Sequence, residues 1–283
     1  MSRTFVTRFA PSPTGYLHRG HAFSALTAHD AARAADGRFI LRIEDIDRTR
    51  CRPEYEAAVY EDLAWLGLRW ETPVRRQSEH MADYARALRE LAERGLLYRC
   101  FRTRREIAEE IERAPHGAME VFRGAPLPAD EEERRVEAGE PFAWRLSLDA
   151  AERALGGFGA LTFVEEGEGP AGERGVLPAR PELGGDVVLA RKDVGVAYHL
   201  AVVVDDALQE ITHVIRGQDL FEATHVQRLL QALLALPTPV YRHHRLLAGP
   251  DGRRFAKRDR AETLRELRAG GVSPADLRRE MGL

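Results

Sequence analysis

Residues 4–43 read TFVTRFAPSPTGYLHRGHAFSALTAHDAARAADGRFILRI, and this stretch predicts a strand, a loop, a helix and a second strand. Residues 4–9 are rich in Phe, Val and Thr, and prolines and a glycine interrupt the chain after them. Residues 20–35 are apolar and helix-forming, and residues 39–43 are a short apolar run. A strand, a crossover helix and a strand of these lengths predict a right-handed βαβ unit with parallel strands. Both strands then end at the same edge of the sheet, which is where open parallel sheets bind ligands.

The rest of the chain continues this alternation of helices and strands, except in one segment whose composition differs. Residues 113–186 are rich in Pro, Gly and Glu, which predicts an inserted, loop-rich module. We therefore expect an α/β fold in which a Rossmann-type parallel sheet is split by that module and followed by a short helical tail. The expected domains are the two halves of the sheet at 1–112 and 187–260, the module at 113–186 and the tail at 261–283. The other expected elements are helices over 54–68, 79–97, 224–236 and 261–281 and strands over 187–189 and 198–204.

The composition is typical of a globular, water-soluble protein, because 44% of the 283 residues are hydrophobic and 31% are charged. The formal charge of -3 excludes a chain-wide positive field, so an RNA partner would need a local basic patch. Two runs are candidates for such a patch or, equally, for a solvated face. They are Arg99, Arg102, Arg104 and Arg105, and the stretch RHHR at 242–245.

Cysteine usage and the absence of a long apolar run bear on location. Cys51 and Cys100 are the only cysteines, which excludes a disulfide scaffold and fits a reducing compartment. Prolines interrupt the first residues before an apolar signal region can form, and no run approaches the ~18 apolar residues of a membrane span. We therefore expect a cytoplasmic protein without membrane contact, and we expect it to be a monomer.

Two histidines, His18 and His21, stand between the first loop and the first predicted helix. Unpaired backbone N–H groups and the helix dipole make a helix N-terminus favourable for anions such as phosphate. Histidines three residues apart can both face one phosphate there, while Gly20 lets a nucleotide lie against the backbone. The simpler interpretation is that both histidines are caps or surface residues. Metal binding by the pair would need further ligands that the neighbouring residues do not supply.

Motifs along most of the chain resemble those of the glutamyl-tRNA synthetases, which are class I enzymes. Residues 8–21 (RFAPSPTGYLHRGH) resemble the opening that contains the class I "HIGH" motif, and residues 254–258 (RFAKR) stand where the second motif, "KMSKS", is expected. Further stretches match in the same order: 42–47 (RIEDID), 65–70 (WLGLRW), 77–78 (QS), 198–206 (YHLAVVVDD) and 211–217 (ITHVIRG). The resemblance implies the class I Rossmann-type fold.

The resemblance also implies activation of L-glutamate with ATP, with Mg²⁺ accompanying the nucleotide. The residues that it implies for glutamate binding are Arg8, Ala10, Ser12, Glu44, Tyr198 and Arg216, and those for ATP binding are His18, Gly20, His21 and Lys257. The histidines and Lys257 are the expected catalytic residues, as donors to the phosphates. Lys257 and Lys192 are the only lysines among 42 basic residues, which favours a functional ammonium at Lys257 over an incidental surface charge.

Acidic residues at two strand ends have competing interpretations. Glu44 follows an apolar run, and a carboxylate there can receive the α-ammonium of an amino acid while an arginine takes the carboxylate. Alternatively, Glu44 solvates the sheet edge. Asp205 and Asp206 follow a run of valines, and for them we expect a turn at the end of a strand rather than a metal site.

Length distinguishes two branches of the family. The chain ends at residue 283, shortly after Lys257, whereas glutamyl-tRNA synthetases continue with a large helical anticodon-binding region. The chain therefore resembles the truncated paralogues, the glutamyl-Q tRNA(Asp) synthetases, which attach glutamate to the queuosine base of tRNA(Asp). Two alternatives stay open at this point: a minimal glutamyl-tRNA synthetase that charges the tRNA 3′ end, and a non-catalytic paralogue that binds glutamate and nucleotide.

Two departures from the family pattern concern zinc and the second motif. The family's zinc site uses a Cys-x-Cys pair with a later Tyr and Cys, but this chain has Arg102 at the second position and no later cysteine. Cys100 and His116 cannot complete a tetrahedral site, so we predict that zinc is absent. Arg254 and Ala256 replace a lysine and a serine of the second motif, which removes one hydroxyl contact to the nucleotide and leaves open whether activity is lower.

Overall fold

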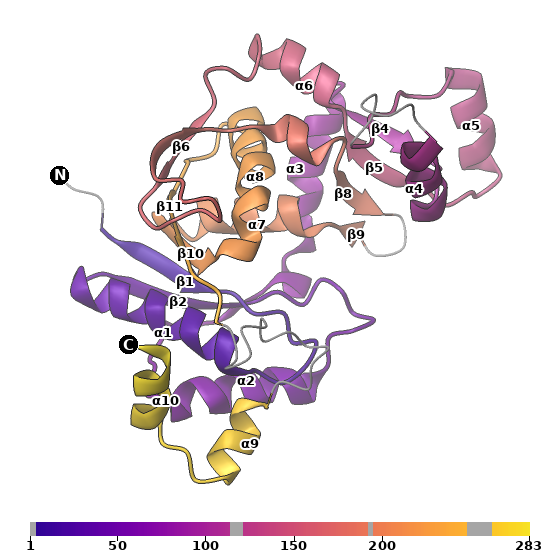
Figure 1. Cartoon of the computed structure of the whole chain (residues 1–283). Coiled ribbons are helices and arrows are strands. Elements are labelled where there is room, and N and C mark those ends of the chain that lie inside the picture. The colour runs from indigo at the N-terminus through magenta and orange to yellow at the C-terminus, as the bar shows by residue number, and fades with distance from the viewer. Residues whose placement is uncertain (1–3, 114–120, 192–194, 248–261) are drawn as a thin grey trace.

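The computed structural model describes residues 4–113, 121–191, 195–247 and 262–283 (Figure 1). It confirms the predicted βαβ unit, which consists of β1 (Val6–Phe9), α1 (Arg19–Ala34) and β2 (Arg38–Ile43). The two strands pair in parallel, from Val6 opposite Arg38 to Phe9 opposite Leu41. Gly37 permits the tight return from α1 to β2, because a Cβ there would lie 2.4 Å from the Phe5 carbonyl oxygen.

Strands from the second half of the chain extend this sheet on the far side of β1. Thr212 makes the junction: its N–H donates to the Val6 carbonyl at 2.9 Å, and its hydroxyl accepts from the Val6 N–H at 2.8 Å. It leads into β10 (His213–Gly217), which pairs in parallel with β11 (Val240–His244), while β3 (Arg75–Arg76) pairs with β2. Strand β10 lies beside β1, so the parallel strands β3, β2 and β1 and the parallel pair β10 and β11 together form the expected Rossmann-type arrangement.

Helices cover both faces of the sheet and form two separate cores. Ile40 and Val214 face the first core, which includes α3 (Met81–Glu93), α7 (Tyr198–Leu208) and α8 (Phe221–Leu233). Leu41 and Ile215 point to the opposite face, where α1 and α2 (Pro53–Trp65) pack. This alternation along β2 and β10 is the period-2 pattern of a sheet that is buried on both sides.

One predicted element is wrong, because residues 198–204 form the first part of helix α7 and not a strand. Every residue from Leu200 to Asp206 is buried, since α7 packs against α3, α8 and β8 (Val188–Arg191). A helix that is buried on all sides shows no amphipathic period, and a short run of valines is then indistinguishable from a buried strand. The aspartates that were expected in a turn accordingly lie in the last two turns of a buried helix.

A second, antiparallel sheet lies beyond α3, toward the upper right of Figure 1. Its order is β4 (Leu97–Cys100), β5 (Ala143–Leu146), β8 and β9 (Gly195–Val196), so strands on both sides of residues 113–186 pair with a strand inside them. The same part of the chain contains α5 (Ala129–Glu137), α6 (Leu148–Leu155), β6 (Thr162–Glu165) and β7 (Gly175–Pro178). It begins with the last residue of α4 (Arg104–Arg113). Strand β6 joins β11 through one parallel pair, Glu165 with Tyr241.

The chain ends in two short helices, α9 (Leu264–Ala269) and α10 (Pro274–Met281), which pack against α2 and α1 (Figure 1). Each begins with a capping box. The Leu264 N–H donates to the Leu17 carbonyl at 2.8 Å, so the tail is attached beside the first loop. Within the described ranges, none of the helices combines the length and the apolar character needed to cross a bilayer.

Candidate functional site

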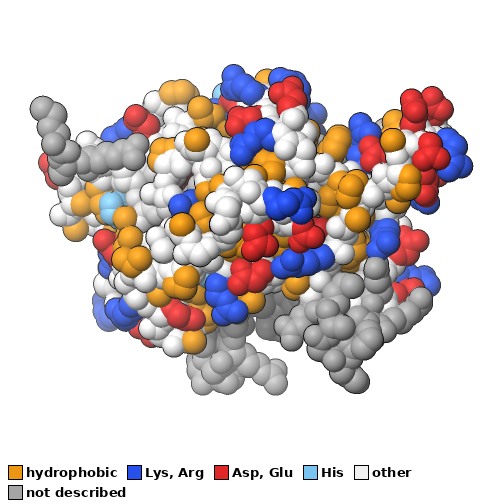
Figure 2. Space-filling model, turned by 90° about the horizontal axis from the view of Figure 1, so that it is seen from above, with side chains coloured by type: hydrophobic (Ala, Val, Ile, Leu, Met, Phe, Trp, Pro, Cys, Tyr) orange, Lys and Arg blue, Asp and Glu red, His pale blue; other side chains and the backbone are white. Residues whose placement is uncertain are grey.

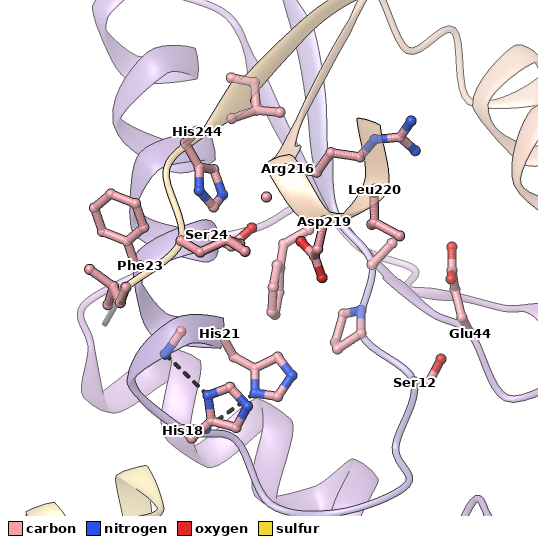
Figure 3. A pocket seen from close by; sticks show the side chains of 18 of the residues that line it. Ser12, His18, His21, Phe23, Ser24, Glu44, Arg216, Asp219, Leu220 and His244 are labelled. Atoms are coloured by element: carbon pink, nitrogen blue, oxygen red, sulfur yellow. Dashed lines mark hydrogen bonds between the residues drawn. The ribbon is translucent and has the colours of Figure 1, made fainter. Parts of the chain in front are cut away.

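The carboxyl ends of β1, β2 and β10 open onto a pocket of about 700 Å³. Every predicted site residue that the structure describes lines it: Arg8, Ala10, Ser12, His18, Gly20, His21, Glu44, Tyr198 and Arg216. In Figure 3, the two histidines lie toward one end of the pocket, and Glu44 and Arg216 lie toward the other. Lys257 and the neighbouring Arg254 and Ala256 fall outside the described residues, so their predicted roles are untested.

The two histidines are oriented by backbone groups at the start of α1. His18 is the N-cap, and its Nδ1 accepts from the Gly20 N–H at 3.1 Å, while Nδ1 of His21 accepts from the His18 N–H at 3.2 Å. A backbone N–H can only donate, so each neutral ring carries its proton on Nε2. Each histidine can therefore accept a backbone hydrogen bond at Nδ1 and donate to a ligand from Nε2. A Cβ at Gly20 would lie 3.1 Å from Cε1 of His18, so the glycine makes room for the capping ring itself.

Arg8 is held in the pocket wall by Asp206 of α7. The guanidinium donates from Nε to Oδ1 at 3.0 Å and from Nη2 to Oδ2 at 3.3 Å, and Nη2 of Arg42 donates to the same Oδ1 at 2.8 Å. Burial alone would raise the pKa of Asp206, but the two guanidiniums outweigh it and keep the pKa below its ordinary value. The two aspartates that end α7 thus form buried ion pairs instead of the expected turn, and no metal-binding group occurs among the described residues.

Glu44 lies at the end of β2, buried, with Oε1 3.3 Å from Nη2 of Arg42. Burial raises the pKa of Glu44 above its ordinary value, although Arg42 and Arg8 oppose the shift. The ionised carboxylate is therefore incompletely compensated by the protein. A cationic ligand group in the pocket would stabilise the ionised form, which is the electrostatic requirement for binding an ammonium group.

Arg216, on β10, is 4% exposed and carries its charge among neutral groups. Its guanidinium donates to Nε2 of His243 at 3.1 Å, to Oε1 of Gln227 at 2.9 Å and to Oγ1 of Thr224 at 2.8 Å. It also lies over the Tyr241 ring, 5.3 Å from the centroid. A buried guanidinium with only neutral partners in direct contact, among the residues described, favours an anionic ligand at the pocket.

A second cavity of about 480 Å³ adjoins the pocket and shares Ser12, Thr14, Glu44 and Tyr198 with it. Its other walls come from the loop after β2 and from the segment before α7. Cys51 and Arg104 are among the residues that line it. The shared wall places this cavity directly beside the carboxylate of Glu44. A second substrate could therefore approach the first one there.

Asp206 and His243 belong to the site although neither was predicted as a site residue from the sequence. His243 was grouped with a solvated or RNA-binding face at 242–245, and that interpretation is wrong for this residue, which is 2% exposed. Strand alternation was the available signal, because Tyr241 and His243 point inward from β11 while Arg242 points outward. Asp206 stands in the matched stretch 198–206, but its partners were not predictable because Arg8 and Arg42 are 198 and 164 positions away.

Cys100 does not belong to a set of zinc ligands within the residues that the structure describes. It is buried on β4 in a small apolar cluster with Tyr98, Ile107 and Phe122. Arg102, at the position of the second cysteine, lies over the Phe122 ring at 5.8 Å. These side chains do not fit a tetrahedral zinc site, and His116 falls outside the described ranges, so the absence of zinc stays a prediction.

Two members of the arginine run that starts at Arg99 form ion pairs with acidic side chains. Arg99 pairs with Glu132 and stacks 4.8 Å from the Trp144 ring centroid, and Arg105 pairs with Glu109 at 2.8 Å. On the face shown in Figure 2, Arg side chains are interspersed with Asp and Glu. RNA binding by this run therefore stays a prediction.

Comparison with known proteins agrees with this geometry. Residues 4–282 match the family of tRNA synthetases class I (E and Q), catalytic domain. A glutamyl-Q tRNA(Asp) synthetase from Rhodobacter capsulatus is 50% identical over 98% of this chain and 100% of its own length. A glutamate–tRNA ligase 2 from Dinoroseobacter shibae is 40% identical over 96% of this chain but only 59% of its own length.

A solved structure shares the fold. The crystal structure of a glutamate tRNA ligase from Elizabethkingia meningosepticum, in complex with its amino acid, superimposes with a TM-score of 0.74 at 28% identity. The match covers 91% of this chain and 52% of that one. The matched family, the sequence relatives and the shared fold lead to one conclusion: the chain belongs to the class I tRNA synthetases of the glutamate and glutamine type, a family of ligases, and resembles its glutamyl-Q tRNA(Asp) synthetases.

Proposed function

We propose that the protein activates L-glutamate with ATP and transfers the glutamyl group to the queuosine base of tRNA(Asp). One observation carries the first half of this proposal: a single pocket combines two buried arginines, Arg8 and Arg216, with a buried carboxylate, Glu44. These charges complement those of a dicarboxylic amino acid, because guanidinium groups bind carboxylates and Glu44 can receive the ammonium. Ala10, Ser12 and Tyr198 complete the proposed glutamate site.

Activation requires no protein nucleophile. The substrate carboxylate attacks the α-phosphorus of ATP, a bond forms between that oxygen and phosphorus, and pyrophosphate leaves. The contribution of the protein is to position the reactants and to stabilise the phosphate charge. His18 and His21 can donate from Nε2 at the N-terminus of α1, with Gly20 between them, and the helix dipole adds to the attraction. Lys257 is proposed as a further phosphate donor, and Mg²⁺ is proposed to enter with ATP.

Transfer follows when a hydroxyl of the RNA attacks the carbonyl carbon of the mixed anhydride and AMP leaves. The second cavity, which shares Glu44 and Tyr198 with the pocket, is the proposed route of approach. The choice of queuosine rests on the Rhodobacter capsulatus relative, whose whole length matches this chain. We further propose that the enzyme acts in the cytoplasm as a monomer, without membrane contact.

A second candidate function is glutamylation of a tRNA 3′ end. The glutamate–tRNA ligase 2 of Dinoroseobacter shibae favours it, since that relative is 40% identical in the matched region. The two functions share the activation chemistry and differ in the acceptor, so the pocket alone does not distinguish them.

Two assays test the proposal in sequence. We expect the purified protein to exchange pyrophosphate into ATP with L-glutamate in the absence of tRNA. Exchange that needs added tRNA would favour the 3′-end function, and no exchange under either condition would refute activation. Labelled glutamate should then be incorporated into tRNA(Asp) from queuosine-containing cells and not into tRNA(Asp) from queuosine-deficient cells. Equal incorporation into both would refute the queuosine acceptor.

A further inference from the structure

A chain of three buried side chains leads from the β6 end to the pocket. It consists of Glu165 at the end of β6, His243 on β11 and Arg216 on β10. The side chains of Glu165 and His243 are fully buried, and Arg216 lines the pocket. The first member thus comes from residues 113–186, whereas the last faces the proposed substrate.

The hydrogen bonds determine which nitrogen of His243 carries its proton. A guanidinium only donates, so Nε2 of His243, 3.1 Å from Nε of Arg216, must be an unprotonated acceptor. The neutral ring therefore has its proton on Nδ1, which lies 2.6 Å from Oε2 of Glu165. Burial lowers the pKa of His243, which keeps the ring neutral and preserves the acceptor at Nε2.

Glu165 is itself oriented by the backbone. Its other oxygen, Oε1, accepts from the N–H of His243 and from the N–H of Gly167, both at 2.8 Å. There is no room for a side chain at position 167, because a Cβ would lie 2.1 Å from the His243 carbonyl oxygen. The carboxylate therefore presents Oε2, and only Oε2, to the ring.

We propose that Glu165 is a positioning residue for the amino-acid site: it sets the tautomer of His243, which in turn directs the guanidinium of Arg216 toward a ligand carboxylate. The identity of that carboxylate as glutamate rests on the proposed function. Second partners that fix the tautomer of a histidine are a general means of orienting a functional group.

Glu165→Gln gives a sharp test because it changes one oxygen into a donor. The amide oxygen has to stay at the Oε1 position, where two backbone N–H groups need an acceptor, so the NH₂ faces Nδ1. The ring then has to place its proton on Nε2, where it confronts the N–H of Arg216. The hydrogen bond from Arg216 to His243 is then lost. Because it involves a charged group, we expect KM for glutamate to rise at least about tenfold. KM for ATP should stay within about twofold, since the change does not touch the nucleotide.

Two measurements make this outcome falsifiable. Nitrogen NMR of labelled histidine should show the Nδ1–H form of His243 in the wild type and the Nε2–H form in Glu165→Gln, and this signal does not depend on any activity. Pyrophosphate exchange should show the split between the two KM values. A flipped tautomer with unchanged KM for glutamate, or a raised KM with an unflipped tautomer, would overturn the relay.

Three further variants separate positioning from general damage. Glu168→Gln lies three residues away on the surface, where its partner is Arg174, and it should change neither the tautomer nor either KM. His243→Gln can donate to Glu165 and accept from Arg216, so KM for glutamate should stay within about threefold of wild type. His243→Met has a similar volume but can neither donate to Glu165 nor replace the ring nitrogen that accepts from Arg216. Its KM for glutamate should therefore rise as in Glu165→Gln. Equal KM values for these two His243 variants would overturn the proposal.

Discussion

Replacing Asp206 of helix α7 with Asn should strongly destabilise the folded protein. Asp206 accepts three hydrogen bonds, two from Arg8 and one from Arg42, and its side chain is 9% exposed. The amide would present an NH₂ group to a guanidinium and remove the negative charge. Arg42 would keep Glu44 at 3.3 Å and Asp205 at 3.7 Å, whereas Arg8 would lose the carboxylate that it binds with two nitrogens.

The expected cost is about 3–5 kcal/mol, which is typical when one partner of a buried ion pair is removed. The chain offers a matched control at its surface. Arg278 binds Asp30 with the same two-oxygen geometry, at 2.7 and 3.0 Å, but the two side chains are 31% and 42% exposed. Asp30→Asn should cost less than about 1 kcal/mol because solvent screens the pair.

Urea unfolding at neutral pH, followed by circular dichroism, measures both costs in the same protein. KM for glutamate in pyrophosphate exchange adds a functional readout, and it should rise for Asp206→Asn because Arg8 loses the group that holds it, while Asp30→Asn leaves it unchanged. If Asp206→Asn lowers the free energy of unfolding no more than Asp30→Asn does, burial does not strengthen the Asp206 ion pairs and the reasoning is refuted.

Four further predictions concern three side chains and the zinc content. Burial raises the pKa of Asp62 on α2 to about 6, from 3.8 in the unfolded chain. Ionisation of Asp62 therefore destabilises the folded state, with the full effect above about pH 6 and none below about pH 4. Asp62→Asn should therefore increase stability by up to about 3 kcal/mol at pH 8 and have little effect at pH 4, and the exposed Glu54→Gln serves as the control. Glu44→Ala should raise KM for glutamate far more than KM for ATP, and equal losses would count against an ammonium site. Lys257→Ala should slow adenylate formation by ~10² or more in single-turnover kinetics. Lys257→Arg should restore that rate only in part, because a guanidinium is planar and larger; a wild-type rate in this variant would show that charge alone matters. Elemental analysis should find no stoichiometric zinc, and about one zinc per chain would mean that residues besides Cys100 and His116 supply zinc ligands.

Local sequence was sufficient for the features that depend on near neighbours. The βαβ unit, the loop before α1 and the placement of His18 and His21 at a helix start all lie within residues 6–43. Periodicity, helix termini and turn residues act over a few positions, so these features are readable without the fold. The motif resemblance then added the glutamate and nucleotide residues, and the structure gathers those that it describes into one pocket.

Tertiary structure alone decided the helical state of residues 198–208 and the partners of the charged groups in the pocket. Residues 200–206 of helix α7 are all buried, so this stretch shows no exposed polar face that would reveal a helical period. Arg8 and Asp206 are 198 positions apart, and Glu165 and His243 are 78 positions apart. No local pattern encodes such pairs, because their energy depends on which side chains the packed sheet and helices exclude from water together.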